Sequence, residues 1–120
     1  IDSLLDRNPN LSPEEVEDVV VGAATHAGEQ DGNLARLAVV LSKLPITVAG
    51  VSINRFCSSG LQAIAIAANQ IASGQTEVAI AGGVDSISMR TRQEPGKAKQ
   101  ISGYWMKNPI SLWLWAILQR

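Results

Sequence analysis

Cys57 is the single cysteine of this 120-residue chain, and it lies in the run INRFCSSGLQA at residues 53–63. An ionised cysteine attacks carbonyl carbons readily and also leaves readily, so this residue could carry a covalent acyl-transfer reaction. No second cysteine is present for an internal disulfide or a CxxC zinc site, and we expect no bound metal. The alternative is structural, because free cysteines are commonly buried as small apolar groups. The spacing of the residues alone favours that alternative.

The residues on either side of Cys57 predict a strand followed by a helix. β-Branched residues favour a strand over residues 46–53, which leads directly into the cysteine. A thiol at the start of the following helix would lie beside unpaired N–H groups, which favour the thiolate. Many alanines keep this helix thin, so we expect it to be buried between other elements. Its predicted face comprises Leu61, Ile64, Ala65, Ala68, Ile71 and Ala72, and Gly74 is predicted to end it.

The rest of the chain continues this alternation of strands and helices. The segments are a capping-box helix at residues 12–15, a β-branched strand at 16–22, an amphipathic helix from Asn33 to Pro45 and a strand at 77–81. Gly82 and Gly83 are expected to form a tight turn that closes the last strand. Strands that alternate with helices indicate an α/β layered domain with a largely parallel sheet.

The composition is that of one modest domain, with 46% hydrophobic residues and a formal net charge of −1. This balance indicates no nucleic-acid partner. The apolar runs are shorter than the roughly 20 residues that cross a bilayer. Residues 1–10 do not resemble a signal peptide, so we expect no membrane span and a cytoplasmic location. Residues 90–109 carry five cations and one acid, and residues 110–120 form an apolar run with two tryptophans.

A longer pattern around Cys57 resembles the thiolases. VNxxCxSGLQAI, followed by an alanine-rich helix, a glycine, a short strand and AGGxxSxS, is typical of acetyl-CoA acetyltransferases and 3-ketoacyl-CoA thiolases. This chain has SINRFCSSGLQAIAIAANQIASGQTEVAIAGGVDSISM at residues 52–89, and residues 19–52 also look like that family. The resemblance covers roughly residues 11–95 and reverses the preference for a structural cysteine.

The resemblance implies that Cys57 is a catalytic nucleophile. In thiolases this position takes an acyl group from a 3-ketoacyl-CoA, releases acetyl-CoA and passes the shortened acyl group to a second coenzyme A. Its backbone N–H is expected to help to stabilise the oxyanion of the tetrahedral intermediate. The resemblance further implies acyl-CoA substrates, coenzyme A as co-substrate, no permanently bound cofactor and a homodimer or homotetramer. A role in fatty-acid β-oxidation or other ketoacyl-CoA metabolism is the corresponding expectation.

The family pattern also divides the chain into three parts. The expected fold is a thiolase-like layered α/β fold, incomplete here, with helices packed on a mostly parallel sheet. Residues 1–89 are expected to be part of the amino-terminal core domain that carries the nucleophile. Residues 90–109 would begin a loop domain that covers coenzyme A, although a solvated loop is the commoner role of such a basic stretch. Residues 110–120 do not resemble a thiolase.

Two further residues and the length of the chain bear on activity. His26, the only histidine, matches no catalytic position of the family, and Asp85 is expected to be structural. Thiolases carry a catalytic histidine and a second cysteine in a later half that this chain lacks, and an opening strand that would precede Ile1. We therefore expect a piece of a longer polypeptide, inactive by itself, and an organellar matrix is an alternative location.

Two alternative functions stay open on these residues. The chain as it stands could be a non-catalytic truncated fragment, at most an association module. A ketoacyl synthase-like condensing enzyme is the other alternative, although such enzymes place different residues after the cysteine than SSGLQA. Thiolysis of a 3-ketoacyl-CoA would separate the enzyme from the fragment.

Overall fold

The computed structural model describes residues 1–86 and 111–119. Its helices are α1 (Asp2–Arg7), α2 (Leu34–Val40) and α3 (Ser59–Ala72), with short 3₁₀ turns at Pro13–Glu15 and Gly28–Gln30. The strands are β1 (Asp18–Gly22), β2 (Ala49–Ile53), β3 (Val78–Asp85) and β4 (Ser111–Gln119). Within these residues, no helix has the length and apolar character that a membrane crossing requires.

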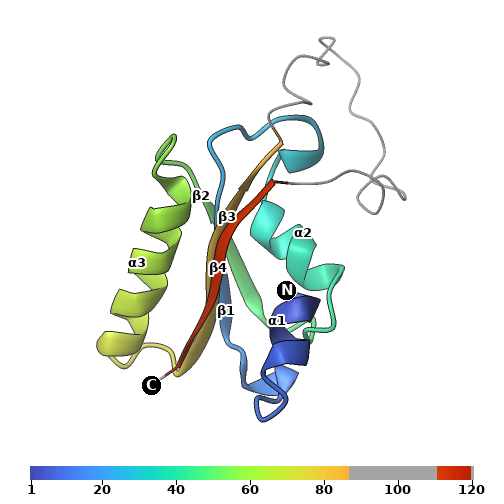
Figure 1. Cartoon of the computed structure of the whole chain (residues 1–120), viewed down its shortest axis with the longest axis vertical. Helices are drawn as coiled ribbons and strands as arrows, with labels where there is room; N and C mark the ends of the chain where they lie inside the picture. Colours follow the sequence, from blue (N-terminus) through green and yellow to red (C-terminus); the bar gives the residue numbers. More distant parts are fainter. Residues whose placement is uncertain (87–110, 120) are drawn as a thin grey trace.

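In the described part of the chain, four strands form one sheet in the order β2–β1–β3–β4. β1 pairs in parallel with β2 on one side and with β3 on the other, whereas β4 runs antiparallel to β3. α3 covers one face of the sheet, and α1 and α2 cover the other (Figure 1). The predicted α/β fold, with helices packed on a mostly parallel sheet, is confirmed.

Alternate residues of β1 point to opposite faces of the sheet and build two core clusters. Val19 and Val21 pack on the side of α1 and α2, where Leu34 and Val39 of α2 are also buried. On the other side, small side chains let α3 lie close to the strands. The buried members of that cluster are Val20, Ala63, Ala67, Ile71, Ala79 and Ala81.

The buried face of α3 differs from the predicted face. Leu61, expected to be in the core, is 71% exposed. Ala65, Ala68 and Ala72 are exposed as well. Ile71 is buried and Ile64 packs against the core, as predicted. The rest of the predicted face was wrong, because apolar residues occur all around this helix and their spacing did not distinguish one face. In the described structure α3 is buried on one face only, at Ser59, Ala63, Ala67 and Ile71.

β3 is longer than predicted and contains the two glycines that were expected to form a turn. The strand runs through Gly82 and Gly83 to Asp85, so the predicted turn is wrong. Gly83 remains in register with Gly22 of β1. Both glycines therefore continue the strand, and Gly83 allows a close approach of the α3 backbone rather than a change of chain direction.

The other predicted elements are present with shifted ends. β1 and β2 begin later than predicted, and α2 ends before Pro45. The predicted cap of α2 is confirmed, because the Asn33 side chain accepts the Arg36 N–H at 3.0 Å. Residues 111–119 of the apolar tail form β4. The basic stretch at residues 90–109 lies outside the described residues.

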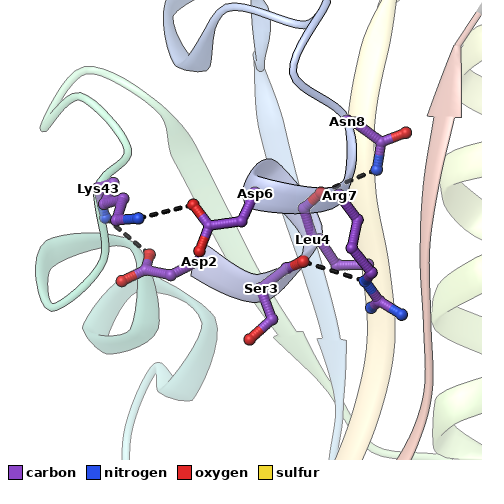
Figure 2. A network of polar contacts seen from close by, with 7 residues as sticks. All are labelled: Asp2, Ser3, Leu4, Asp6, Arg7, Asn8 and Lys43. Carbon is purple, nitrogen blue, oxygen red and sulfur yellow. Dashed lines mark hydrogen bonds and ion pairs between the residues drawn. The ribbon is translucent and has the colours of Figure 1, made fainter.

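α1 was not predicted, because its six residues are too few to show a helical period. Its Leu5 is buried in the core. On the outer side, Asp6 binds the Lys43 Nζ at 2.7 Å and Asp2 accepts the Lys43 backbone N–H at 2.9 Å (Figure 2). The hydrogen bond that the Lys43 ammonium donates to Asp6 raises the pKa of Lys43. Both side chains of the ion pair are exposed, and exposed pairs contribute little to stability.

The attachment of α1 should therefore depend on Leu5 and not on the ion pair. Leu5→Ala should lower the free energy of unfolding by about 2–4 kcal/mol, because it removes a buried side chain and leaves a cavity. Asp6→Asn, the matched change one residue away, should leave the urea midpoint within error of the wild type. Urea unfolding followed by circular dichroism measures both. An equal loss in the two variants would contradict this account of α1.

Candidate functional site

Cys57 lies at the junction between β2 and α3. β2 ends at Ile53, and α3 begins at Ser59 with Ser58 as its N-cap residue. The junction is at the end of the sheet where the parallel strands β1, β2 and β3 finish (Figure 1). The Cys57 side chain is exposed. The structure thus places the sulfur on the surface at the start of a helix and not in the core.

Phe56, directly before Cys57, has a left-handed backbone. Its φ is +50°, the single positive value of a non-glycine residue in the described part of the chain. This conformation costs a bulky L-residue about 1–2 kcal/mol. The Phe56 side chain is 77% exposed, so core packing does not hold it there. Local hydrogen bonds must stabilise the turn instead.

Asn54, Ser58 and Ser59 supply those hydrogen bonds, and the Ser58 Oγ donates to the Arg55 carbonyl oxygen at 2.9 Å. The Asn54 Oδ1 accepts the Phe56 N–H at 2.8 Å. The Ser59 Oγ accepts the Arg55 N–H at 2.8 Å and donates to the Phe56 carbonyl oxygen at 2.6 Å. Together they hold the peptide groups on both sides of Phe56. They therefore set the direction in which the chain enters Cys57.

Three glycines meet where the first turn of α3 rests directly on the sheet. A Cβ added at Gly22 would lie 2.2 Å from the backbone carbonyl carbon and oxygen of Ser59. A Cβ added at Gly83 would lie 2.7 Å from the Gly60 Cα. We call Gly22, Gly60 and Gly83 the glycine seat. It fixes the height of the helix start above β1 and β3.

Asp85 and Asn54 tie the loop after β1 to the neighbouring strands. The Asp85 carboxylate accepts the N–H groups of Ala24 at 2.8 Å and Thr25 at 3.2 Å. The Asn54 Nδ2 donates to the Ala24 carbonyl oxygen at 3.1 Å. These bonds give Asp85 a structural role, in agreement with the expectation from the sequence.

His26 is bound within its own loop. Its Nε2 lies 2.9 Å from the Ala23 carbonyl oxygen. The same loop is closed by Gln30, which is 2% exposed and whose Nε2 donates to the Thr25 carbonyl oxygen at 2.6 Å. No described hydrogen bond joins the imidazole to Cys57, and we keep His26 outside the site.

Charged groups around the turn are few in the described structure. The Arg55 guanidinium donates to the Gln62 side-chain oxygen on α3. Across residues 1–86 and 111–119, no three histidine, cysteine or acidic residues gather as ligands for a metal ion. A surface hollow of about 420 Å³ lies at the opposite end of the strands and is lined by Glu14, Glu15, Glu17, Glu77, Val78 and Gln119. The chemistry available at the turn is therefore that of the thiol and of nearby backbone N–H groups.

The structure adds residues that sequence reasoning did not place in the site. Ser59 and Asn54 hold the turn, and Gly22 receives the helix start. The signal for Ser59 was its position in the first turn of a predicted helix directly before a glycine. Gly22 gave no local signal, because its contact partner is far away in the sequence.

Comparison with known proteins identifies the family of this chain. Residues 1–111 match the family described as Thiolase, N-terminal domain. The chain belongs to the thiolase family. The match extends further on both sides than the resemblance seen around Cys57.

Curated thiolases align with most of this chain. The beta-ketoadipyl-CoA thiolase of Pseudomonas putida is 46% identical over 102 residues, 85% of this chain and 25% of that protein. The 3-oxoadipyl-CoA/3-oxo-5,6-dehydrosuberyl-CoA thiolase of Escherichia coli strain K12 is 49% identical over 85 residues, 71% of this chain and 21% of that protein. The 3-ketoacyl-CoA thiolase of Pseudoalteromonas atlantica is 43% identical over 84 residues, which are 70% of this chain and 22% of that protein. The chain thus spans about a quarter of the length of these thiolases.

Proposed function

We propose that this chain supplies the nucleophile of a thiolase-type acyltransferase and that Cys57 is that nucleophile. The observation that carries the proposal is the exposed Cys57 at the start of α3, held by a left-handed residue and a hydrogen-bonded turn. Surface exposure lets a thioester substrate reach the sulfur.

The proposed reaction proceeds in two acyl transfers. The Cys57 thiolate attacks the C3 carbonyl of a 3-ketoacyl-CoA, and the bond between C2 and C3 breaks as acetyl-CoA leaves and takes up a proton. Coenzyme A then attacks the cysteine thioester, which regenerates the Cys57 thiolate and releases the shortened acyl-CoA. The Cys57 backbone N–H is proposed to stabilise the oxyanion of each tetrahedral intermediate. Coenzyme A is a co-substrate and no permanent cofactor is needed.

The names of the relatives favour a particular 3-ketoacyl-CoA. Beta-ketoadipyl-CoA and 3-oxoadipyl-CoA thiolases are among the proteins that align with this chain. We therefore propose a substrate whose acyl chain ends in a carboxylate, as an adipyl group does. Fatty-acid β-oxidation, the expectation from the motif, becomes the second candidate, and the 3-ketoacyl-CoA thiolase of Pseudoalteromonas atlantica favours it.

The remaining expectations form part of the same proposal. Residues 1–89 belong to the core domain that carries the nucleophile, residues 90–109 begin a loop domain over coenzyme A, and residues 110–120 depart from the family. The active form is a homodimer or homotetramer in the cytoplasm. The general acids and bases come from further polypeptide, so the 120-residue chain alone is inactive.

Acyl trapping tests this proposal in a completed enzyme. In that enzyme, residues 1–109 of this chain replace the corresponding region of the Pseudomonas putida beta-ketoadipyl-CoA thiolase. After rapid acid quenching with 3-oxoadipyl-CoA, peptide mass spectrometry should find a succinyl thioester on Cys57. The 120-residue chain, treated in the same way, should show no turnover.

Two results would contradict the proposal. One is an acyl group found on another residue of the quenched, active enzyme. The other is thiolysis by the 120-residue chain at the rate of the completed enzyme, which would show that no further catalytic groups are needed.

A further inference from the structure

The turn that precedes Cys57 must be held by hydrogen bonds within the chain. Phe56 has a left-handed φ of +50° and an exposed ring, so neither backbone preference nor packing holds its conformation. If the turn relaxed to an extended backbone, the peptide that leads into Cys57 would change direction. The position of the sulfur relative to α3 would then vary.

The Ser59 hydroxyl is bound on both sides of the strained residue. It accepts the Arg55 N–H at 2.8 Å and donates to the Phe56 carbonyl oxygen at 2.6 Å. The Arg55 N–H belongs to the peptide that leads into Arg55, and the Phe56 carbonyl oxygen belongs to the peptide that joins Phe56 to Cys57. One oxygen atom therefore connects the start of the turn to the peptide that enters Cys57. Ser59 is 3% exposed, and water therefore cannot replace these bonds easily.

Ser59 is itself fixed to the sheet. Its backbone carbonyl group lies where a Cβ on Gly22 would come within 2.2 Å, so β1 and the start of α3 touch without a side chain between them. The hydroxyl thus projects from an immobile part of the fold. It connects the sheet, through the turn, to the residue that carries the sulfur.

We infer that Ser59 is a positioning residue, whose buried hydroxyl holds the Phe56 turn and so sets the location of the Cys57 sulfur. The inference rests on the proposed function for its catalytic meaning, because positioning matters for turnover only if Cys57 is the nucleophile. Ser59 does not touch the reacting atoms in this role. It acts through the Arg55 N–H and through the peptide that joins Phe56 to Cys57.

The reactivity of Cys57 in the 120-residue chain gives the first test. Cys57 is the only cysteine, so the rate of iodoacetamide alkylation reports on this sulfur alone. The readout is the ratio of the rate in the native chain to that in the same chain in urea, measured from pH 6 to pH 9. Ser59→Ala should move this ratio toward one by at least about fivefold, because it removes two hydrogen bonds and the net contribution of one corresponds to about that factor.

Ser73→Ala is the matched control. Ser73 follows α3, and its hydroxyl donates to the Gln70 carbonyl oxygen at 2.9 Å, three residues back, as that of Ser59 does to Phe56. This variant should alkylate at the wild-type ratio. Should Ser59→Ala fail to fold, Asn54→Ala provides the second variant, because it removes the exposed bond to the Phe56 N–H and should move the ratio in the same direction.

The completed enzyme gives the second test. Ser59→Ala should lower kcat by about tenfold to a hundredfold and leave KM unchanged, because small misplacements of a reacting group have effects of that size. Ser59→Thr keeps the hydroxyl and should recover part of kcat. Ser73→Ala should keep the wild-type kcat.

The outcomes separate this inference from the proposed function. The positioning role of Ser59 is overturned if the Ser59→Ala chain folds and keeps the wild-type alkylation ratio. If Ser59→Ala does not fold, an unchanged ratio in Asn54→Ala overturns it. If instead the alkylation ratio changes as expected but Cys57→Ala leaves the completed enzyme active, Ser59 does position the sulfur and the assignment of Cys57 as the nucleophile is wrong.

Discussion

Cys57→Ser in the completed enzyme is expected to abolish thiolysis, with kcat reduced by more than about 10⁴-fold. Serine is nearly the same size as cysteine, so the exposed turn should keep its structure. Its hydroxyl has a far higher pKa than a thiol and gives almost no anion for attack near neutral pH. The loss should therefore appear in kcat, with the circular dichroism spectrum and the urea midpoint unchanged. Steady-state thiolysis of 3-oxoadipyl-CoA measures it.

Substrate protection distinguishes a nucleophile from a nearby bystander. Acyl-CoA should protect Cys57 of the completed wild-type enzyme from iodoacetamide, because the acylated sulfur can no longer react. Ser73→Ala, on the far end of α3, should retain wild-type turnover and show the same protection. Normal turnover in Cys57→Ala would refute the assignment and leave the exposed cysteine without a catalytic role.

Gly22→Ala is the second change with a large expected effect, and it acts on folding. The new Cβ would lie 2.2 Å from the Ser59 carbonyl carbon and oxygen, and both are backbone atoms that cannot rotate away. α3 would have to move off β1, which would expose Val20 and the alanines beneath it. We expect a loss of at least about 3 kcal/mol in the free energy of unfolding, at the upper end for overpacked cores. Urea unfolding of the 120-residue chain measures this loss.

The other members of the glycine seat provide graded controls. A Cβ at Gly83 would lie 2.7 Å from the Gly60 Cα, whereas a Cβ at Gly60 would lie 3.4 Å from the Gly83 Cα. Gly83→Ala should therefore be destabilising to a smaller degree than Gly22→Ala. Gly60→Ala should be close to neutral, because the contact is ordinary and alanine favours the helix. The same urea midpoint in all three variants would contradict the proposed close approach.

The sequence predicted the order of the elements but not all of their contacts. β-Branched runs mark buried parallel strands clearly, which is why β1 and the class of the fold were predictable. The buried face of α3 was not, since Leu61 and Ala65 look as apolar as Ala63 and Ala67. Ala63 and Ala67 are buried because they contact Val20, Ala79 and Ala81 of the sheet. Contacts between segments distant in the sequence have no local signal.

The candidate site was predictable to a similar degree. The sequence predicted that Cys57 lies at the start of a helix, because a strand precedes it and two serines and a glycine follow it. The left-handed Phe56 could not be predicted, because phenylalanine rarely adopts that conformation. Its stability depends on the Ser59 hydroxyl and on Gly22, which lies far away in the sequence. Tertiary contact overrides local preference at this point.

The antiparallel return of β4 has a consequence for how such enzymes diversify. Asp85 and Ser111 face each other across the β3–β4 pair, so the chain leaves and re-enters the sheet at the end that carries the Cys57 turn (Figure 1). Doubling the length of a connection adds only about 0.6 kcal/mol to the entropy of closing it. The pairing of β3 with β4 is therefore compatible with connections of different length between Asp85 and Ser111. An insertion at this point would leave the strand order and the glycine seat unchanged.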